Sequence, residues 1–223
     1  MKVVKNYLYN ASYQILNLLI PLITVPYISR VLGAHDVGIN EYTNSWVTFF
    51  YLMGQMGITL YGNREVAYHR DDLYERSRTF WGVEALQLLT VSASLIAYLV
   101  AVFLFSTTFK YYFLLQGIWI IATGLDVSWY FMGLENFKVT VVRNTFVRLI
   151  SIVLIFTIVK DVNDLGKYIA ILGGTQLVGN LTLWPYLKDN LVWVKISEWH
   201  PFKHFYPALL LFIPTITTQV YLV

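Results

Sequence analysis

The sequence predicts an all-α membrane protein, a polytopic bundle of six transmembrane helices plus a truncated seventh, with a cytoplasmic N-terminus. Apolar residues make up 57% of the 223 residues and charged residues 13%, about half the charged share of a soluble domain. The mean hydropathy is +0.56. The apolar residues also fall into runs of about 20, the length that crosses about 30 Å of hydrocarbon as a helix. A soluble fold of this size could not bury so much apolar surface.

The apolar runs define the expected spans in chain order. They cover residues 7–28, 42–61, 80–105, 111–132, 140–159 and 167–187, and a seventh begins near residue 206. The first run is too long for the apolar part of a signal peptide and lacks a small-residue cleavage site. The connections are short, and even the longest polar ones, residues 62–79 and 188–205, are too small for a separate domain. We therefore expect residues 1–205 to form an N-terminal bundle and residues 206–223 to start a second.

The distribution of lysine and arginine predicts the orientation. With the N-terminus inside, eleven of these residues lie on the cytoplasmic side and four outside, and Arg148 lies within the fifth span. The inner set is Lys2, Lys5, Arg64, Arg70, Arg76, Arg78, Lys138, Arg143, Lys188, Lys195 and Lys203. The outer set is Arg30, Lys110, Lys160 and Lys167. Cytoplasmic connections carry the excess of positive residues in membrane proteins, so the N-terminus is expected in the cytoplasm.

The seventh apolar run echoes the first. Residues 20–24 (IPLIT) and 213–217 (IPTIT) match at four of five positions. Six intervening spans would place both copies in the same orientation, as in the parallel internal repeats of secondary transporters. Two unrelated helices that each contain proline remain the alternative. The run reaches Val223 without a polar tail, and we expect the chain to be the front half of a longer transporter.

Several classes of protein are disfavoured. The chain has no cysteine, which excludes disulfides, thiol nucleophiles and cysteine-based zinc sites. His200 and His204 are separated by Pro201 and lack a further nearby ligand, so we expect no metal site and no cofactor. The basic segment of residues 63–78 is interleaved with acidic residues, which favours a solvated loop over a nucleic-acid partner. No phosphate-binding glycine loop or catalytic constellation occurs.

Three ionisable residues inside or near predicted spans are singled out, because such groups usually face a cavity or a partner. Folding the chain about Asn136 brings Asp126 level with the stretch between Arg143 and Arg148. Arg143 is shallow, and we expect it to extend towards the headgroups. Arg148 is too deep for that, and either lines a cavity or pairs with Asp126. Tyrosine and tryptophan near the ends of the fourth span, including Trp129 and Tyr130, are interpreted as anchors at the membrane interface.

Two stretches have a recognisable pattern. The first is residues 26–33 (PYISRVLG), followed by Gly38, Gly57 and residues 62–65 (GNRE). The second is residues 125–135 (LDVSWYFMGLE), followed by residues 143, 144 and 148. Together they resemble the polysaccharide-biosynthesis export proteins, which are repeat-unit flippases of the superfamily that also holds multidrug and lipid-linked oligosaccharide exporters. The matched positions are Arg30, Gly33, Arg64, Glu65, Asp126, Trp129, Gly133, Glu135, Arg143 and Arg148.

The resemblance implies two six-helix bundles around a central cavity in the cytoplasmic membrane. It implies export of an oligosaccharide on a polyprenyl diphosphate, without enzymatic activity. The expected partners are this lipid-linked oligosaccharide, membrane lipids, and the polymerase and assembly proteins of polysaccharide synthesis; coupling to an H⁺ or Na⁺ gradient stays open. Arginine binds diphosphate in a planar, bidentate manner. The candidate substrate-binding residues are Arg30, Arg64, Asp126, Arg143 and Arg148.

Three other functions remain open at this point. A multidrug antiporter would share the fold but needs acidic groups for apolar cations, whereas the deep charges here are mostly arginine. A membrane polysaccharide polymerase would need a large outer loop with catalytic groups, and the outer connections are short. A scaffold without transport activity is the third alternative.

Overall fold

The protein is helical throughout its described part. A computed structural model describes residues 18–105 and 108–222, with side chains up to residue 213. Lys2, Lys5 and the first half of the expected first span lie outside these residues. A helical segment, Leu18–Val31, comes first. The long helices that follow are α2 (Gly33–Gln55), α3 (Ile58–Tyr68), α4 (Leu73–Phe105), α5 (Lys110–Gly124), α7 (Phe137–Ile158), α8 (Leu165–Leu181) and α9 (Phe205–Leu222). The short helices are α6 (Ser128–Gly133), η1 (Val162–Asp164), η2 (Trp184–Leu187), η3 (Ile196–Glu198) and η4 (Pro201–His204).

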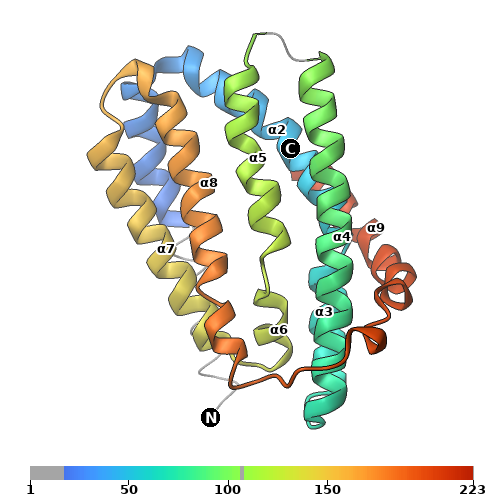
Figure 1. Ribbon diagram of the computed structural model, residues 1–223. Coiled ribbons are helices and arrows are strands. Elements are labelled where there is room, and N and C mark those ends of the chain that lie inside the picture. The colour runs from blue at the N-terminus through green and yellow to red at the C-terminus, as the bar shows by residue number, and fades with distance from the viewer. Residues whose placement is uncertain (1–17, 106–107, 223) are drawn as a thin grey trace.

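The long helices form a bundle in which α5 lies between α4 and α8, and α7 flanks α8 (Figure 1). By length and composition, α4 and α7 are each able to cross a membrane. A third segment is long and apolar enough to cross a membrane only if its two parts are taken together. These parts are Leu18–Val31 and the helices of Gly33–Tyr68, and they meet at a bend of 120°. Only 22% and 17% of the most apolar windows of α4 and α7 are buried, so their outer faces suit lipid. The protein is thus a membrane protein, while the six-span count and the cytoplasmic N-terminus stay predictions.

The second predicted span differs from the structure at both ends. The expected span of residues 42–61 is replaced by α2 and α3, which begin at Gly33 and end at Tyr68. The break between them falls at Met56 and Gly57, whose φ angles are 43° and 72°. A positive φ ends a right-handed helix. Glycine is the residue that adopts it most readily.

The fourth predicted span is also interrupted. α5 ends at Gly124, and α6 begins at Ser128, so Asp126 lies in the break and not in a continuous helix. No proline marks this break. The backbone amides of Leu125 and Asp126 donate to the carbonyls of Ala122 and Thr123, at 3.2 Å each.

The two stretches that carry the recognisable pattern pack against each other through α3 and α6. A Cβ atom on Gly62 would lie 2.5 Å from the ring of Trp129, and one on Gly133 would lie 2.7 Å from the carbonyl oxygen of Asn63. Trp129 and Tyr130 are buried, with 1% and 0% exposure. Their interpretation as membrane-interface anchors is therefore wrong, because both side chains are buried and Trp129 packs on Gly62.

The polar segment of residues 188–204 crosses one end of the bundle before α9 begins (Figure 1). The Tyr130 hydroxyl donates to the carbonyl of Asn190 at 2.7 Å. The backbone amide of Val192 donates to the Ser77 hydroxyl at 3.0 Å. Beyond this segment, α9 packs against α3. The copies of the short repeat, residues 20–24 and 213–217, both lie in helices.

Candidate functional site

The candidate site is built around the break between α5 and α6. Asp126 lies in this break, and its carboxylate accepts a hydrogen bond from the backbone amide of Ser128 at 2.9 Å. This bond holds the carboxylate at the first turn of α6. The Asp126 side chain is 25% exposed, so it faces a space that is partly open.

Arg143 approaches Asp126 from α7. Its Nη2 lies 3.9 Å from Asp126 Oδ1, and its Nη1 donates to Asn180 Oδ1 at 3.1 Å. The Arg143 side chain is 10% exposed. The expectation that Arg143 extends towards the headgroups is therefore wrong. The cause is local, because an inward guanidinium compensates the Asp126 charge and satisfies the Asn180 amide.

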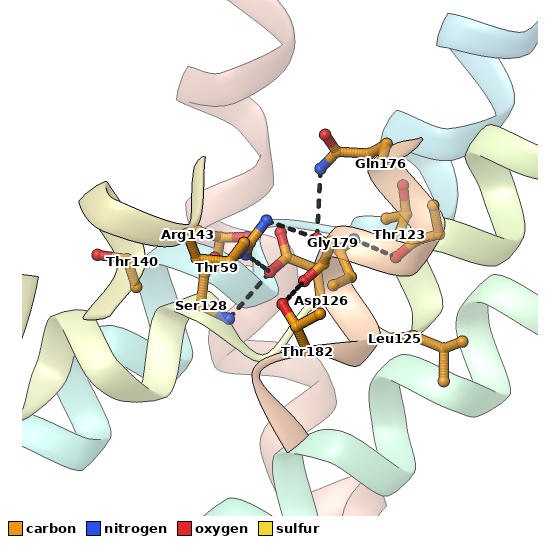
Figure 2. Close-up of polar contacts among 12 residues, drawn as sticks. Thr59, Thr123, Leu125, Asp126, Ser128, Thr140, Arg143, Gln176, Gly179 and Thr182 are labelled. Carbon is orange, nitrogen blue, oxygen red and sulfur yellow. Dashed lines mark hydrogen bonds and ion pairs between the residues drawn. The ribbon is translucent and has the colours of Figure 1, made fainter. Parts of the chain in front are cut away.

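α8 completes the cluster through Gln176 (Figure 2) and through Asn180, one turn further along the helix. Asn180 is buried, and its Nδ2 donates to the carbonyl of Ala122 at 2.6 Å. Gln176 Nε2 donates to the same Asn180 oxygen that Arg143 contacts, at 3.3 Å. Asn180 thus ties the end of α5 to α7 and α8, and it fixes where the Arg143 guanidinium lies.

These groups line a cavity of about 230 Å³ between α5, α7 and α8, which we call the polar cavity. Its lining comprises Trp119, Asp126, Ser128, Arg143, Asn144, Val147, Arg148 and Gln176. Arg148 lies in this lining, and the ion pair of Asp126 is formed with Arg143. The two arginines supply two positive charges and Asp126 one negative charge, so these three residues leave a net charge of +1.

Of the five predicted site residues, the structure brings three together and separates two. Asp126, Arg143 and Arg148 share the polar cavity. Arg30 and Arg64 have exposed side chains and are not part of its lining. Arg30 lies in the last turn of the helical segment Leu18–Val31, and Arg64 lies on α3.

An apolar groove adjoins the polar cavity on the α7–α8 face. It has a volume of about 630 Å³, and the two spaces share Arg143 and Val147. Its other walls include Ile150, Leu154 and Ile171. We call it the α7–α8 groove. A polar cavity that continues into an apolar groove offers separate surfaces for the head and the chain of an amphiphile.

The sequence interpretation missed one buried acid. Glu84 lies on α4 inside the expected third span, and it is 1% exposed. An acidic residue inside a predicted span indicates a functional site, but Glu84 lies in a largely apolar run and was not singled out. Gln87, one turn further on, donates through Nε2 to the carbonyls of Thr123 and Asp126, at 2.8 and 3.1 Å.

His204 is buried outside the polar cavity, where it packs against α3. Its Nδ1 lies 2.7 Å from the Tyr61 hydroxyl. Burial, reinforced by the positive charges of Lys203 and Arg78, lowers the pKa of His204 to about 4. The ring is therefore neutral near pH 7 and joins α3 to the start of α9. Among the described residues, no group of three acidic or histidine side chains is placed to hold a metal ion.

Comparison with known proteins gives a consistent result over nearly the whole chain. Residues 3–216 match the family model described as "Polysaccharide biosynthesis protein". A protein of Escherichia coli K12, whose name gives O-antigen transport as its provisional role, is 27% identical over 182 residues. That alignment covers 79% of this chain and 42% of the relative. A protein of the same name from Shigella dysenteriae is 25% identical over 150 residues, which cover 67% of this chain and 38% of the relative.

The chain thus spans about two fifths of the length of these two relatives. No solved structure matches it significantly. The family match includes α2 to α8 and with them every residue that lines the polar cavity and the α7–α8 groove. The chain therefore belongs to the polysaccharide biosynthesis protein family.

Proposed function

We propose that the full-length protein containing this chain moves polyprenyl-diphosphate-linked oligosaccharide repeat units from the inner to the outer leaflet of the cytoplasmic membrane. The units would serve the synthesis of capsule, exopolysaccharide or O-antigen. One observation carries the proposal: two arginines line a polar cavity inside a bundle whose outer faces are apolar. An anionic headgroup needs such a path, because charged groups do not cross hydrocarbon unaided.

The geometry around Arg143 suits exchange of one anion for another. Charge-assisted N–H···O contacts are normally about 2.7–2.9 Å, whereas Arg143 Nη2 lies 3.9 Å from Asp126 Oδ1. The ion pair is therefore loose, and a phosphate oxygen could replace the carboxylate without breaking an optimal hydrogen bond. Asn180 would keep the guanidinium in place during the exchange. Arg148 would bind the second phosphate in the same planar, bidentate manner.

The α7–α8 groove would accommodate the start of the prenyl chain. It begins at Arg143, so a chain attached to a diphosphate in the polar cavity would enter it directly. The rest of the chain would remain in lipid, which is its natural solvent. Movement of this bundle against a second one would then expose the site to either leaflet.

A flippase of this kind would deliver its product to a polymerase at the outer leaflet. An H⁺ or Na⁺ gradient would supply the energy. Arg30 and Arg64 would attract the diphosphate at the two mouths of the path.

The test is to introduce Arg148→Ala into the gene that encodes this chain. Surface polysaccharide should be lost, and lipid-linked repeat units should accumulate on the inner leaflet. The variant should still insert into the membrane, as checked by immunoblotting of the membrane fraction. Lys138→Ala is the matched control, because this exposed residue lies on the same helix and carries the same charge. Normal surface polysaccharide in Arg148→Ala cells would refute the assignment of Arg148.

The same experiment separates the other functions. Loss of a polymerase would let single repeat units reach the outer face, whereas loss of a flippase holds them inside. Loss of a multidrug antiporter would leave polysaccharide intact and raise sensitivity to apolar cations. A scaffold would leave the distribution of lipid-linked units between the leaflets unchanged.

A further inference from the structure

Glu84 has an environment that the polar cavity does not explain. It lies inside α4, the helix with the most apolar window in the described structure. The residue is 1% exposed, and neither carboxylate oxygen has a hydrogen-bond partner among the described residues. An ionised carboxylate in such a place is strongly unfavourable, because it has lost water and gained no donor.

The neighbours of Glu84 on α4 include a further buried acceptor oxygen without a hydrogen-bond donor among the described residues. Phe80, Glu84 and Gln87 lie at positions i, i+4 and i+7 and so share one face of α4. Phe80 stacks on Trp129 with ring centroids 5.5 Å apart, so this face is turned towards α6. Gln87 Oε1 is buried and, like the Glu84 oxygens, has no partner in the described structure. The site therefore holds three acceptor oxygens that have no partner in the described structure, and Glu84 and Gln87 lie one turn apart on the same face of α4.

Gln87 connects this site to the break between α5 and α6. Its Nε2 donates to the carbonyls of Thr123 and Asp126, at 2.8 and 3.1 Å. Asp126 in turn pairs with Arg143 in the polar cavity. A change in the hydrogen bonding of Gln87 therefore acts on the backbone that positions Asp126.

Other titratable groups belong to the elements packed against α4, which are α2, α3, α5 and η4. α3 carries Tyr61, Arg64, Glu65 and Tyr68, and η4 carries Lys203 and His204. α2 and α5 carry His35, Asp36, Glu41, Tyr42, Tyr51, Lys110, Tyr111 and Tyr112. The carboxylate of Asp126, at the α5–α6 break, belongs to the same set of charged groups.

We propose that Glu84 is a proton-binding site, protonated in the conformation described here, and that it controls the α5–α6 break through Gln87. In this state the carboxyl O–H donates to Gln87 Oε1. In a second conformation the carboxyl reaches water and releases its proton there, which leaves a carboxylate and frees Gln87. The proton site itself rests on the burial of Glu84 and on the lack of hydrogen-bond partners for its two oxygens in the described part of the chain. Its coupling to movement of an anionic lipid rests on the proposed function.

The proton is tested by infrared difference spectroscopy of the purified full-length protein near pH 7. Protonated carboxyl groups absorb separately from carboxylates, and Glu84→Gln should remove a carboxyl band that Glu75→Gln retains. Glu75 is a suitable control because it lies on the same helix and its side chain is 40% exposed. Retention of the band in Glu84→Gln would overturn the assignment of a bound proton. A Glu84→Asp variant should keep a shifted carboxyl band, which separates loss of the proton from loss of the fold.

Coupling is tested in proteoliposomes containing lipid-linked oligosaccharide. For one proton per cycle, a tenfold proton gradient should change the distribution of the lipid between leaflets by up to about tenfold. Glu84→Gln should abolish this response, and Glu75→Gln should keep it. A response that persists in Glu84→Gln would overturn the coupling. If the wild-type protein moves no lipid-linked oligosaccharide at all, the proposed function fails, and the spectroscopic result still decides the proton site.

Discussion

The contact between Gly57 and α9 gives a prediction whose size follows from the structure. Gly57 has a φ angle of 72°, and a Cβ atom there would lie 2.7 Å from both the carbonyl oxygen of Ala208 and the amide nitrogen of Phe212. Alanine at this φ costs about 1–2 kcal/mol. The atoms it meets are backbone, so α9 must move, and overpacking of this kind costs about 1–3 kcal/mol. Gly57→Ala should therefore destabilise the protein by about 2–5 kcal/mol.

Two other glycines separate the strain from the clash. Gly33 has a φ angle of 78°, but no described atom lies within 4 Å of a Cβ built on it. Gly33→Ala should therefore show the strain alone, about 1–2 kcal/mol. Gly38 lies inside α2 with open space and no positive φ. Gly38→Ala should stabilise the helix by about 0.5–1 kcal/mol.

The assay is unfolding of the purified full-length protein in detergent, followed by circular dichroism at increasing denaturant. The expected order of stability is Gly38→Ala, wild type, Gly33→Ala and then Gly57→Ala. If Gly57→Ala were no less stable than Gly33→Ala, the backbone of α9 would not lie against Gly57, and the packing of α9 on α3 would be refuted.

Three further predictions concern particular side chains. The pKa of His204 is lowered to about 4 in the folded protein, against about 6.5 when unfolded. The contribution of neutral His204 to the free energy of unfolding should therefore be complete above about pH 6.5 and be lost as the pH falls towards 4. Thermal melts in detergent should show a melting temperature that falls over this pH range, and His204→Gln should reduce that fall. Asn180→Leu leaves the Ala122 carbonyl and a guanidinium without their amide partner, and should cost about 1–3 kcal/mol in denaturant unfolding; an unchanged midpoint would contradict the bridging role. Gly174 lines the α7–α8 groove with no described atom within 4 Å of its would-be Cβ; Gly174→Leu should slow movement of lipid-linked oligosaccharide in proteoliposomes without unfolding the protein, whereas Gly38→Leu should not, and equal rates would exclude the groove from the path.

The sequence predicted the class of fold and one cluster of charged residues. Long apolar runs correspond to α4 and α7, because a membrane helix is specified by composition and length. Folding the chain about Asn136 placed Asp126 beside the two arginines, and the three residues do share a cavity. Short-range geometry sufficed there, since two consecutive segments joined by a tight turn must run antiparallel.

The sequence did not predict the two helix breaks, between α2 and α3 and between α5 and α6. The break at Asp126 has no proline, and apolar residues on both sides make the run look continuous. The break places Asp126 outside a continuous helix, where its carboxylate lies 3.9 Å from Arg143 Nη2. Trp129 looked like an interface anchor because only the structure shows that Gly62 gives its ring a place inside the bundle.

The central claim is that Arg143 and Arg148 bind the diphosphate of a lipid carrier. Its most direct test is the affinity of the purified full-length protein in nanodiscs for polyprenyl diphosphate and for polyprenyl monophosphate. The diphosphate should bind more tightly than the monophosphate. Arg148→Gln should lose about tenfold or more in affinity, as expected when a charged hydrogen bond of about 1.5–3 kcal/mol is removed, and Lys138→Gln should lose none. Equal affinity for both lipids, or equal binding by wild type and Arg148→Gln, would contradict it.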